Sequence, residues 1–167
     1  MIYFVTGGQR SGKSKFAQQL AKRLSDTPIY LATSRVWDEN HQARIRRHQI
    51  DRDASWRTVE EEKYLSKHQL AGEVVVLDCI TLWLTNFFMD TEFNLEETLE
   101  LAKGELEDFL RQDFTLIAIS NEIGMGLHGE NENGRKFVDL QGWMNQFLAD
   151  RADEVFFMVS GLPLKVK

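Results

Sequence analysis

The chain has 167 residues, of which 43% are hydrophobic and 28% are charged, and this length predicts a single domain, 1–167, with a sizeable core. Its formal net charge of −6 argues against general nucleic-acid binding, which requires a basic surface. The sequence shows no membrane span, no signal-peptide pattern and one cysteine, Cys79, so we expect a cytoplasmic protein without an internal disulfide.

The first predicted elements form a phosphate-binding unit. Residues 2–6 are an apolar run typical of a buried strand, and 13–24 carry an apolar stripe at helical spacing. Residues 7–14 match the Walker A pattern G-x-x-x-x-G-K-[ST], whose backbone N–H groups and lysine hold phosphates and whose last hydroxyl can bind Mg²⁺. The predicted nucleotide contacts are Gly7, Gly8, Gln9, Arg10, Ser11, Gly12, Lys13 and Ser14, with Lys13 also catalytic and Ser14 also a metal ligand.

A second strand and a basic helix are expected next. Residues 29–32 form the strand, and Thr33, Ser34 and Arg35 follow its carboxyl end, where ligands of open α/β sheets bind. A helix is predicted from about residue 38 to 50, with histidines and arginines sharing one face. That face is either solvated surface or a lining for triphosphate charge, and spacing alone favours the solvated surface.

The clearest strand after the first is 73–78, in which three valines and a leucine end at Asp78. This is the Walker B pattern, in which the aspartate holds Mg²⁺ directly or through water. A strand-end aspartate can also be a simple cap, but beside a Walker A loop the metal role is favoured. Cys79 is expected to be a packed residue rather than a nucleophile.

Alternating helices and strands complete the chain. A glycine-rich loop is expected over 121–129, and its His128 either contacts substrate or lies on the surface. The alternation predicts a three-layer α/β domain of the P-loop NTPase type, with a largely parallel sheet and an antiparallel C-terminal edge strand. The other predicted helices are 63–70, 81–89, 94–111 and 134–149, and the other predicted strands are 55–59, 115–120, 155–159 and 162–166.

These segments together resemble one family, the bifunctional adenosylcobinamide kinase / adenosylcobinamide-phosphate guanylyltransferases of cobalamin biosynthesis. The resemblance covers nearly the whole chain. It is most specific at 7–14 (Gly-Gly-Gln-Arg-Ser-Gly-Lys-Ser), at 43–48 (Ala-Arg-Ile-Arg-Arg-His) and at 121–126 (Asn-Glu-Ile-Gly-Met-Gly).

The resemblance implies two reactions at one site. The hydroxyl of the aminopropanol arm of adenosylcobinamide would be phosphorylated from ATP or GTP, and GMP would then pass from GTP to that phosphate. It implies that His48 carries GMP as a covalent intermediate, that Mg²⁺ is the cofactor and that the protein is a homotrimer. The nucleotide contacts implied beyond the phosphate loop are Ala32, Thr33, Ser34, Gln49, Ile50, Asp51, Arg52, Glu60 and Asp78.

Three departures from the family pattern leave the balance of the two activities open. Some relatives carry Glu at the position of Asp78, Pro at Gly129, or a second histidine at Arg47. Two other hypotheses stand beside this one: a P-loop small-molecule kinase without guanylyl transfer, and a nucleotide-binding regulatory module. Labelling of His48 by GTP, and turnover with cobinamide, would separate the three.

Overall fold

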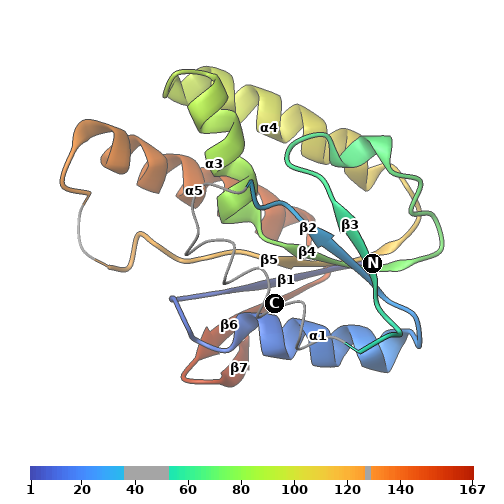
Figure 1. Ribbon diagram of the computed structural model, residues 1–167. Coiled ribbons are helices and arrows are strands. Elements are labelled where there is room, and N and C mark those ends of the chain that lie inside the picture. The colour runs from blue at the N-terminus through green and yellow to red at the C-terminus, as the bar shows by residue number, and fades with distance from the viewer. Residues whose placement is uncertain (36–52, 127–128) are drawn as a thin grey trace.

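A computed structural model describes residues 1–35, 53–126 and 129–167 (Figure 1). The helix predicted over 38–50 and the candidate residue His128 therefore lie outside the described residues. The described strands are β1 (Ile2–Gly7), β2 (Ile29–Ala32), β3 (Arg57–Glu60), β4 (Val74–Asp78), β5 (Thr115–Ile119), β6 (Glu154–Val159) and β7 (Leu162–Lys165). The described helices are α1 (Lys13–Leu24), α3 (Ile80–Asp90), α4 (Leu95–Leu110), α5 (Glu132–Arg151) and a short 3₁₀ turn, η1 (Leu65–Lys67).

The strands form one sheet in the order β3-β2-β4-β5-β1-β6-β7. All neighbouring pairs are parallel except the last, in which β7 runs antiparallel to β6. Pro163 lies in β7, at the edge of the sheet, where a missing N–H breaks no ladder. The predicted parallel sheet with an antiparallel edge strand is confirmed.

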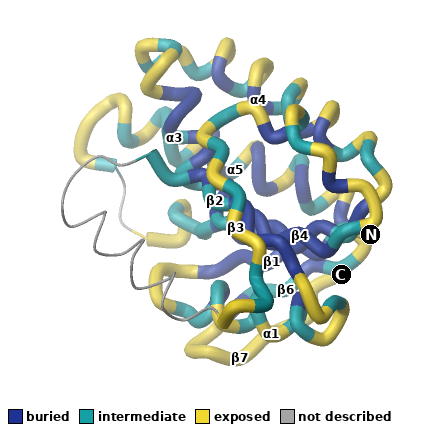
Figure 2. Tube along the Cα trace, turned by 45° about the vertical axis from the view of Figure 1, so that its right-hand side comes forward, coloured by how far each residue is buried: buried dark blue, intermediate teal, exposed yellow. Residues whose placement is uncertain are grey.

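Helices cover both faces of this sheet: α1 packs on one face, and α3, α4 and α5 pack on the other (Figure 1). Because successive side chains of a strand point to opposite faces, neighbouring residues enter different cores. Phe4 and Leu77 pack in the core beneath α3–α5, whereas Val5 and Val76 pack against α1. The central strands β1, β2, β4 and β5 are accordingly buried, whereas the edge strands β3 and β7 and the outer sides of the helices are exposed (Figure 2), and the three-layer prediction is confirmed.

The helix predicted over 63–70 is wrong, because only the three-residue turn η1 forms there. The Glu61 carboxylate accepts hydrogen bonds from the backbone N–H groups of Lys63 and Tyr64, at 3.0 and 2.9 Å. The backbone N–H of Ser66 donates to a glutamate of α4 at 2.7 Å. These N–H groups belong to what would be the first helical turn, which has no internal partners. The backbone N–H of Leu70, which a helix would pair with the carbonyl oxygen of Ser66, donates instead to the Gln112 side chain at 2.9 Å, and the segment takes an irregular path.

Asparagine caps set the starts of the two long helices. The Asn94 side chain accepts a hydrogen bond from the backbone N–H of Glu97 at 3.2 Å, which confirms the predicted cap of α4. The Asn131 side chain accepts one from the backbone N–H of Gly134 at 2.7 Å. This second cap starts α5 at Glu132, earlier than the predicted start at Gly134.

None of the described helices is long and apolar enough to cross a membrane.

The core beneath α4 provides a test of the packing. Leu106 is fully buried on this helix, whereas Leu101 on the same helix is 47% exposed. We expect Leu106→Ala to lower the free energy of unfolding by about 2–5 kcal/mol, because it leaves a cavity in a close-packed core. Leu101→Ala is the matched control and should cost less than about 0.5 kcal/mol in urea unfolding. Equal losses for the two variants would contradict this placement of α4.

Candidate active site

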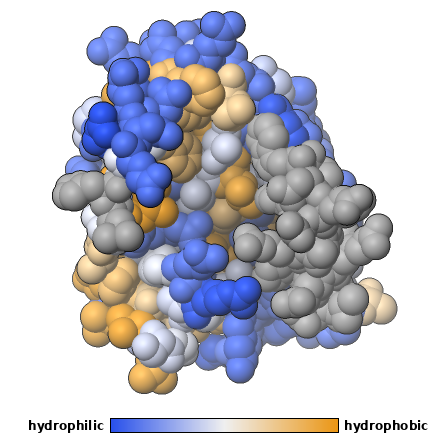
Figure 3. All heavy atoms as spheres, turned by 60° about the vertical axis from the view of Figure 1, so that its left-hand side comes forward, coloured by the Kyte–Doolittle hydropathy of each residue, from blue (hydrophilic) through white to orange (hydrophobic). Residues whose placement is uncertain are grey.

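A cavity of about 1160 Å³ runs across the carboxyl edge of the sheet. Its lining comes from the loop after β1, from the ends of β2, β3 and β4, from the loop after β5, and from Phe157 of β6. Hydrophilic and hydrophobic side chains both reach the hollow on this face of the molecule (Figure 3). Ligands of open parallel sheets bind at this edge, beyond the strand ends.

Two positions of the phosphate loop accommodate only glycine. Gly7 has a φ of 150°, and a Cβ there would lie 2.8 Å from the carbonyl oxygen of Met158. Gly12 has a φ of 95°, and a Cβ there would lie 3.0 Å from the Cα of Gly161. The backbone N–H of Gly161 also donates to the carbonyl oxygen of Ser11 at 2.9 Å. The loop is therefore pressed against β6 and the β6–β7 turn, which leaves no room for side chains at these two points.

Lys13 starts α1 beneath this loop and is 8% exposed. Its ammonium group donates to the carbonyl oxygens of Gly7 and Gly8, at 3.0 and 2.6 Å. Burial lowers the pKa of Lys13 from its ordinary value, and the charge of Asp78 opposes that shift. A buried cation needs anionic or dipolar partners, and a triphosphate beside the loop would add strong ones.

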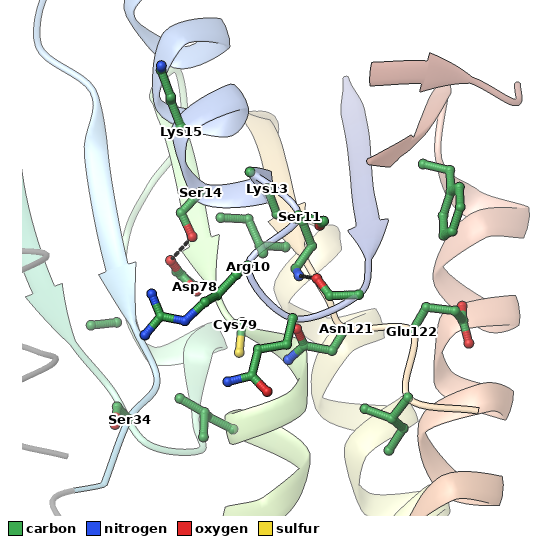
Figure 4. A pocket seen from close by; sticks show the side chains of 18 of the residues that line it. Arg10, Ser11, Lys13, Ser14, Lys15, Ser34, Asp78, Cys79, Asn121 and Glu122 are labelled. Carbon is green, nitrogen blue, oxygen red and sulfur yellow. Dashed lines mark hydrogen bonds between the residues drawn. The ribbon is translucent and has the colours of Figure 1, made fainter. Parts of the chain in front are cut away.

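The two predicted metal ligands meet at the end of β4 (Figure 4). The Ser14 hydroxyl donates to Oδ2 of Asp78 at 3.1 Å, and the phenol of Tyr30 donates to the same oxygen at 2.6 Å. Among the described residues no group of three or more His, Cys, Asp or Glu side chains could hold a metal ion. One carboxylate and one hydroxyl suit Mg²⁺, which keeps waters and takes phosphate oxygens as further ligands. The residues present therefore fit the predicted cofactor.

Thr33 joins the ends of β2 and β4. It is fully buried, and its hydroxyl donates to the carbonyl oxygen of Cys79 at 2.8 Å while accepting from the Cys79 N–H at 2.9 Å. The amide of Asn86 on α3 donates to the Thr33 carbonyl oxygen at 2.8 Å. The Thr33 side chain thus ties the strand ends together and does not line the cavity. Burial raises the pKa of Cys79 to about 12, as expected for a packed thiol.

Ion pairs fix the chain where it leaves β2. Arg35 binds Glu62 at 2.6 Å and Asp90 at 2.9 Å, and Lys63 binds Asp90 at 2.9 Å. Hydrogen bonds from Arg35 and Lys63 hold the pKa of the Asp90 carboxyl well below its usual range. Arg35 follows the strand end as predicted, but it does not line the cavity.

Most of the other predicted nucleotide contacts line one cavity. Gly7 does not line it, but its carbonyl oxygen accepts a hydrogen bond from Lys13. His48 and the four residues that follow it lie outside the described residues. The predicted contacts that line the cavity are Gly8, Gln9, Arg10, Ser11, Gly12, Lys13, Ser14, Ala32, Ser34, Glu60 and Asp78.

Sequence reasoning missed a buried hydrogen-bond network behind the loop after β5. The Gln141 side chain donates to the Ser120 hydroxyl at 2.8 Å, and the Ser120 hydroxyl donates to the side-chain oxygen Oδ1 of Asn145 at 2.7 Å. The Asn145 amide group in turn donates to the Asn121 carbonyl oxygen at 3.1 Å and to the Glu122 carboxylate at 3.3 Å. The sequence does carry a signal for this network, because the amide residues Gln141 and Asn145 are four positions apart and lie beside the apolar stripe of α5.

A second helix holds the same loop from its other side. Both the backbone N–H and the side-chain amide of Asn121 donate to the Thr81 hydroxyl, at 3.1 and 3.0 Å. The backbone N–H of Glu122 donates to the carbonyl oxygen of Gly7 at 3.1 Å. The start of the loop is therefore fixed relative to α3, α5 and the phosphate loop.

A glycine-rich phosphate loop, a strand-end aspartate and a parallel sheet define a P-loop nucleotide-binding enzyme. Within that class, residues 3–166 match the family described as cobinamide kinase / cobinamide phosphate guanyltransferase, and the chain belongs to it. The kinase and guanylyltransferase activities predicted from the resemblance are those of this family, so the predicted family and its two activities are confirmed.

The curated relatives match along nearly their whole length. The chain is 37% identical to the bifunctional adenosylcobalamin biosynthesis protein CobP of Pseudomonas aeruginosa, over 98% of this chain and 95% of that one. It is 35% identical to the bifunctional adenosylcobalamin biosynthesis protein CobU of Escherichia coli and 37% identical to that of Salmonella typhimurium. In both comparisons 100% of each chain is covered.

The buried network predicts a large effect from a small change at Asn145. Asn145→Asp replaces a donor by a carboxylate that faces Glu122 and leaves the Asn121 carbonyl oxygen without its partner. We expect the free energy of unfolding at pH 7.5 to fall by about 2–4 kcal/mol, because like charges meet and a buried acceptor is unpaired. The control Asn145→Ser introduces no charge. Lowering the pH should therefore reduce the stability difference between the aspartate variant and the wild type, and leave the difference between the serine variant and the wild type unchanged. A pH-independent loss would contradict the charge explanation.

Proposed function

We propose that this cavity phosphorylates adenosylcobinamide with ATP or GTP and then transfers GMP from GTP to the product, giving adenosylcobinamide-GDP and pyrophosphate. The observation that carries the proposal is the meeting of Lys13, Ser14 and Asp78 in one cavity of a chain from this family. A lysine, a hydroxyl and a strand-end carboxylate are the parts that phosphoryl transfer requires, because its catalysis is mostly positioning and charge stabilisation.

The triphosphate binds along the phosphate loop. The loop N–H groups and the positive end of α1 attract phosphate oxygens, and Lys13 adds a full charge from beneath. Arg10 and Lys15 line the same side of the cavity and increase its positive potential. The proposed nucleotide contacts are the phosphate loop with Ala32, Ser34, Gln49, Ile50, Asp51, Arg52, Glu60 and Asp78. Thr33 supports them without contact, because its hydroxyl fixes the strand end.

Ser14 and Asp78 would hold Mg²⁺, which offsets phosphate charge when it is bound. Tyr30 donates to Asp78 and so orients its carboxylate toward the hydroxyl of Ser14. In the kinase step the acceptor hydroxyl oxygen bonds to the γ-phosphorus and releases its proton to solvent, as the bond between the γ-phosphorus and the β-phosphate oxygen breaks. Lys13 stabilises the charge that develops on the transferred group and the leaving diphosphate.

Guanylyl transfer passes through His48 in this proposal. A neutral imidazole nitrogen attacks the α-phosphorus of GTP, and a P–N bond forms as pyrophosphate leaves. An oxygen of cobinamide phosphate then attacks the same phosphorus, the P–N bond breaks, and His48 is regenerated. The arginines at 44, 46, 47 and 52 supply charge that offsets the phosphates of both partners.

We also propose a homotrimer located in the cytoplasm. Support for assembly comes from the edge strand β7, where Leu162, Leu164 and, just beyond it, Val166 are 72%, 58% and 66% exposed. Exposed apolar residues on a sheet edge favour covering by another chain. Sedimentation equilibrium would measure the oligomeric state directly.

The proposal is tested by the products of one incubation. The protein is mixed with GTP, Mg²⁺ and cobinamide, and the corrinoids are analysed by mass. Cobinamide-GDP supports both activities, cobinamide phosphate alone supports a kinase without guanylyl transfer, and GDP without any modified corrinoid supports a regulatory nucleotide-binding module.

Asp78→Asn tests the metal assignment. The amide keeps the shape of the carboxylate but loses its charge, so Mg²⁺-dependent turnover should fall at least about a hundredfold while nucleotide still binds. Rates are measured across a Mg²⁺ titration, with Asp108→Asn on the outer surface of α4 as the control. If activity and Mg²⁺ dependence stay at wild-type values, Asp78 only caps β4.

His48→Ala tests the covalent carrier. Guanylyl transfer should fall at least about a thousandfold, because the nucleophile is gone, whereas direct γ-phosphoryl transfer should keep a measurable rate. GTP labelled at the α-phosphate should leave an acid-labile, alkali-stable label on the wild type. His41→Ala is a matched histidine change in the same segment and should keep the label. A label that persists in His48→Ala would defeat the assignment.

A further inference from the structure

The cavity has two sides of different chemistry, and the nucleotide accounts for only one of them. The phosphate loop and the ends of β2, β3 and β4 form the side on which the proposed contacts that line the cavity lie. Other lining residues come from the loop after β5, from α3 and from β6. They include Leu82, Asn121, Glu122, Ile123, Met125 and Phe157.

The net charge of the second side is negative, whereas on the phosphate side three basic side chains outnumber the carboxylates of Glu60 and Asp78. Arg10, Lys13 and Lys15 line the cavity from the phosphate loop and α1, whereas the described residues of the second side include no lysine or arginine. Among those same described residues, the one charged group is the Glu122 carboxylate. Such a surface repels phosphates and suits a neutral ligand with hydroxyl or amide groups.

Apolar side chains make up most of the rest of this side. Met125 is 74% exposed, and Ile123 lines the cavity from the same loop. Methionine is unbranched and polarisable, so it adapts to irregular apolar ligands. An exposed methionine on a cavity wall is therefore available to a ligand surface rather than to the core.

The polar residues of this side are held firmly in place. Thr81 accepts two hydrogen bonds from Asn121, and the buried Asn145 donates to both Asn121 and Glu122. In Figure 4 Glu122 lies across the cavity from Asp78, next to α5. Such pre-organised polar groups bind and orient a ligand with little ordering cost.

We propose that the loop 121–126, with Leu82 and Phe157, is the binding site for the acceptor arm of cobinamide. This inference rests on the proposed function and names the site of its second substrate. The arm is neutral and ends in a hydroxyl, which donates to Glu122 or Asn121, while Met125 and Ile123 contact its hydrocarbon part. Because the Glu122 N–H binds Gly7, this site keeps a fixed position relative to the phosphate loop.

The two reactions then make opposite demands on Glu122. In the kinase reaction the acceptor is a neutral hydroxyl, which a carboxylate attracts as a hydrogen-bond donor. In the transferase reaction the acceptor is already a phosphate, which the same carboxylate repels. One substitution should therefore weaken the binding of the first acceptor and not of the second.

The experiment compares Glu122→Gln and Met125→Ala in the full-length protein. Glu122→Gln should raise KM for cobinamide about threefold to tenfold and leave KM for cobinamide phosphate unchanged or lower. Met125→Ala should raise KM for both corrinoids about threefold to tenfold, because it removes apolar contact. Kd for GTP, measured by calorimetry, should stay within about twofold of the wild-type value.

Matched controls are Glu130→Gln, an exposed carboxylate that does not line the cavity, and Met89→Ala, a methionine on α3 that is 42% exposed. Both controls should keep wild-type values of KM. A change in Kd for GTP with unchanged corrinoid KM would overturn the inference, as would wild-type constants in both test variants. Wild-type protein that turns over no cobinamide would instead overturn the proposed function.

Discussion

The site depends on one carboxylate oxygen, Oδ2 of Asp78, which accepts hydrogen bonds from Ser14 and Tyr30. These three residues come from β4, α1 and β2, so the contact joins the phosphate loop to the strands that carry the nucleotide side of the cavity. Parallel strands make this possible, because all their carboxyl ends lie at one edge. Helices on both faces leave that edge open, and the cavity forms there.

The position of β5 is consistent with the proposal that one cavity serves two substrates. This strand lies between β1, which carries the phosphate loop, and β4, which carries Asp78. The loop that follows β5 therefore starts between the lysine and the carboxylate, within reach of a bound triphosphate. Thr81 of α3 and Asn145 of α5 hold the start of that loop through hydrogen bonds. The loop that would face the triphosphate therefore has a fixed starting position.

Most of the fold could be predicted because its strands are continuous apolar runs and its glycine motif has strict spacing. The failure at 63–70 has a physical cause: the N–H groups of Ser66 and Leu70 donate to the side chains of Glu105 and Gln112, which are about forty residues away, and such long-range pairing leaves no local pattern. The phosphate loop could be predicted from that spacing, and Asp78 from the apolar run that ends at it. The roles of Thr33 and Asn145 could not, since each depends on which strand or helix end becomes its neighbour.

The close contact between Gly12 and Gly161 extends the nucleotide site into a part of the molecule that touches no substrate. The β6–β7 turn supports the phosphate loop from behind, with 3.0 Å between the Cα of Gly161 and the place of a Gly12 side chain. A surface hairpin is usually a tolerant place for insertions and substitutions. Here the turn supports the phosphate loop from behind, so an insertion or a bulky substitution that moves the backbone between β6 and β7 would displace the phosphate loop as well.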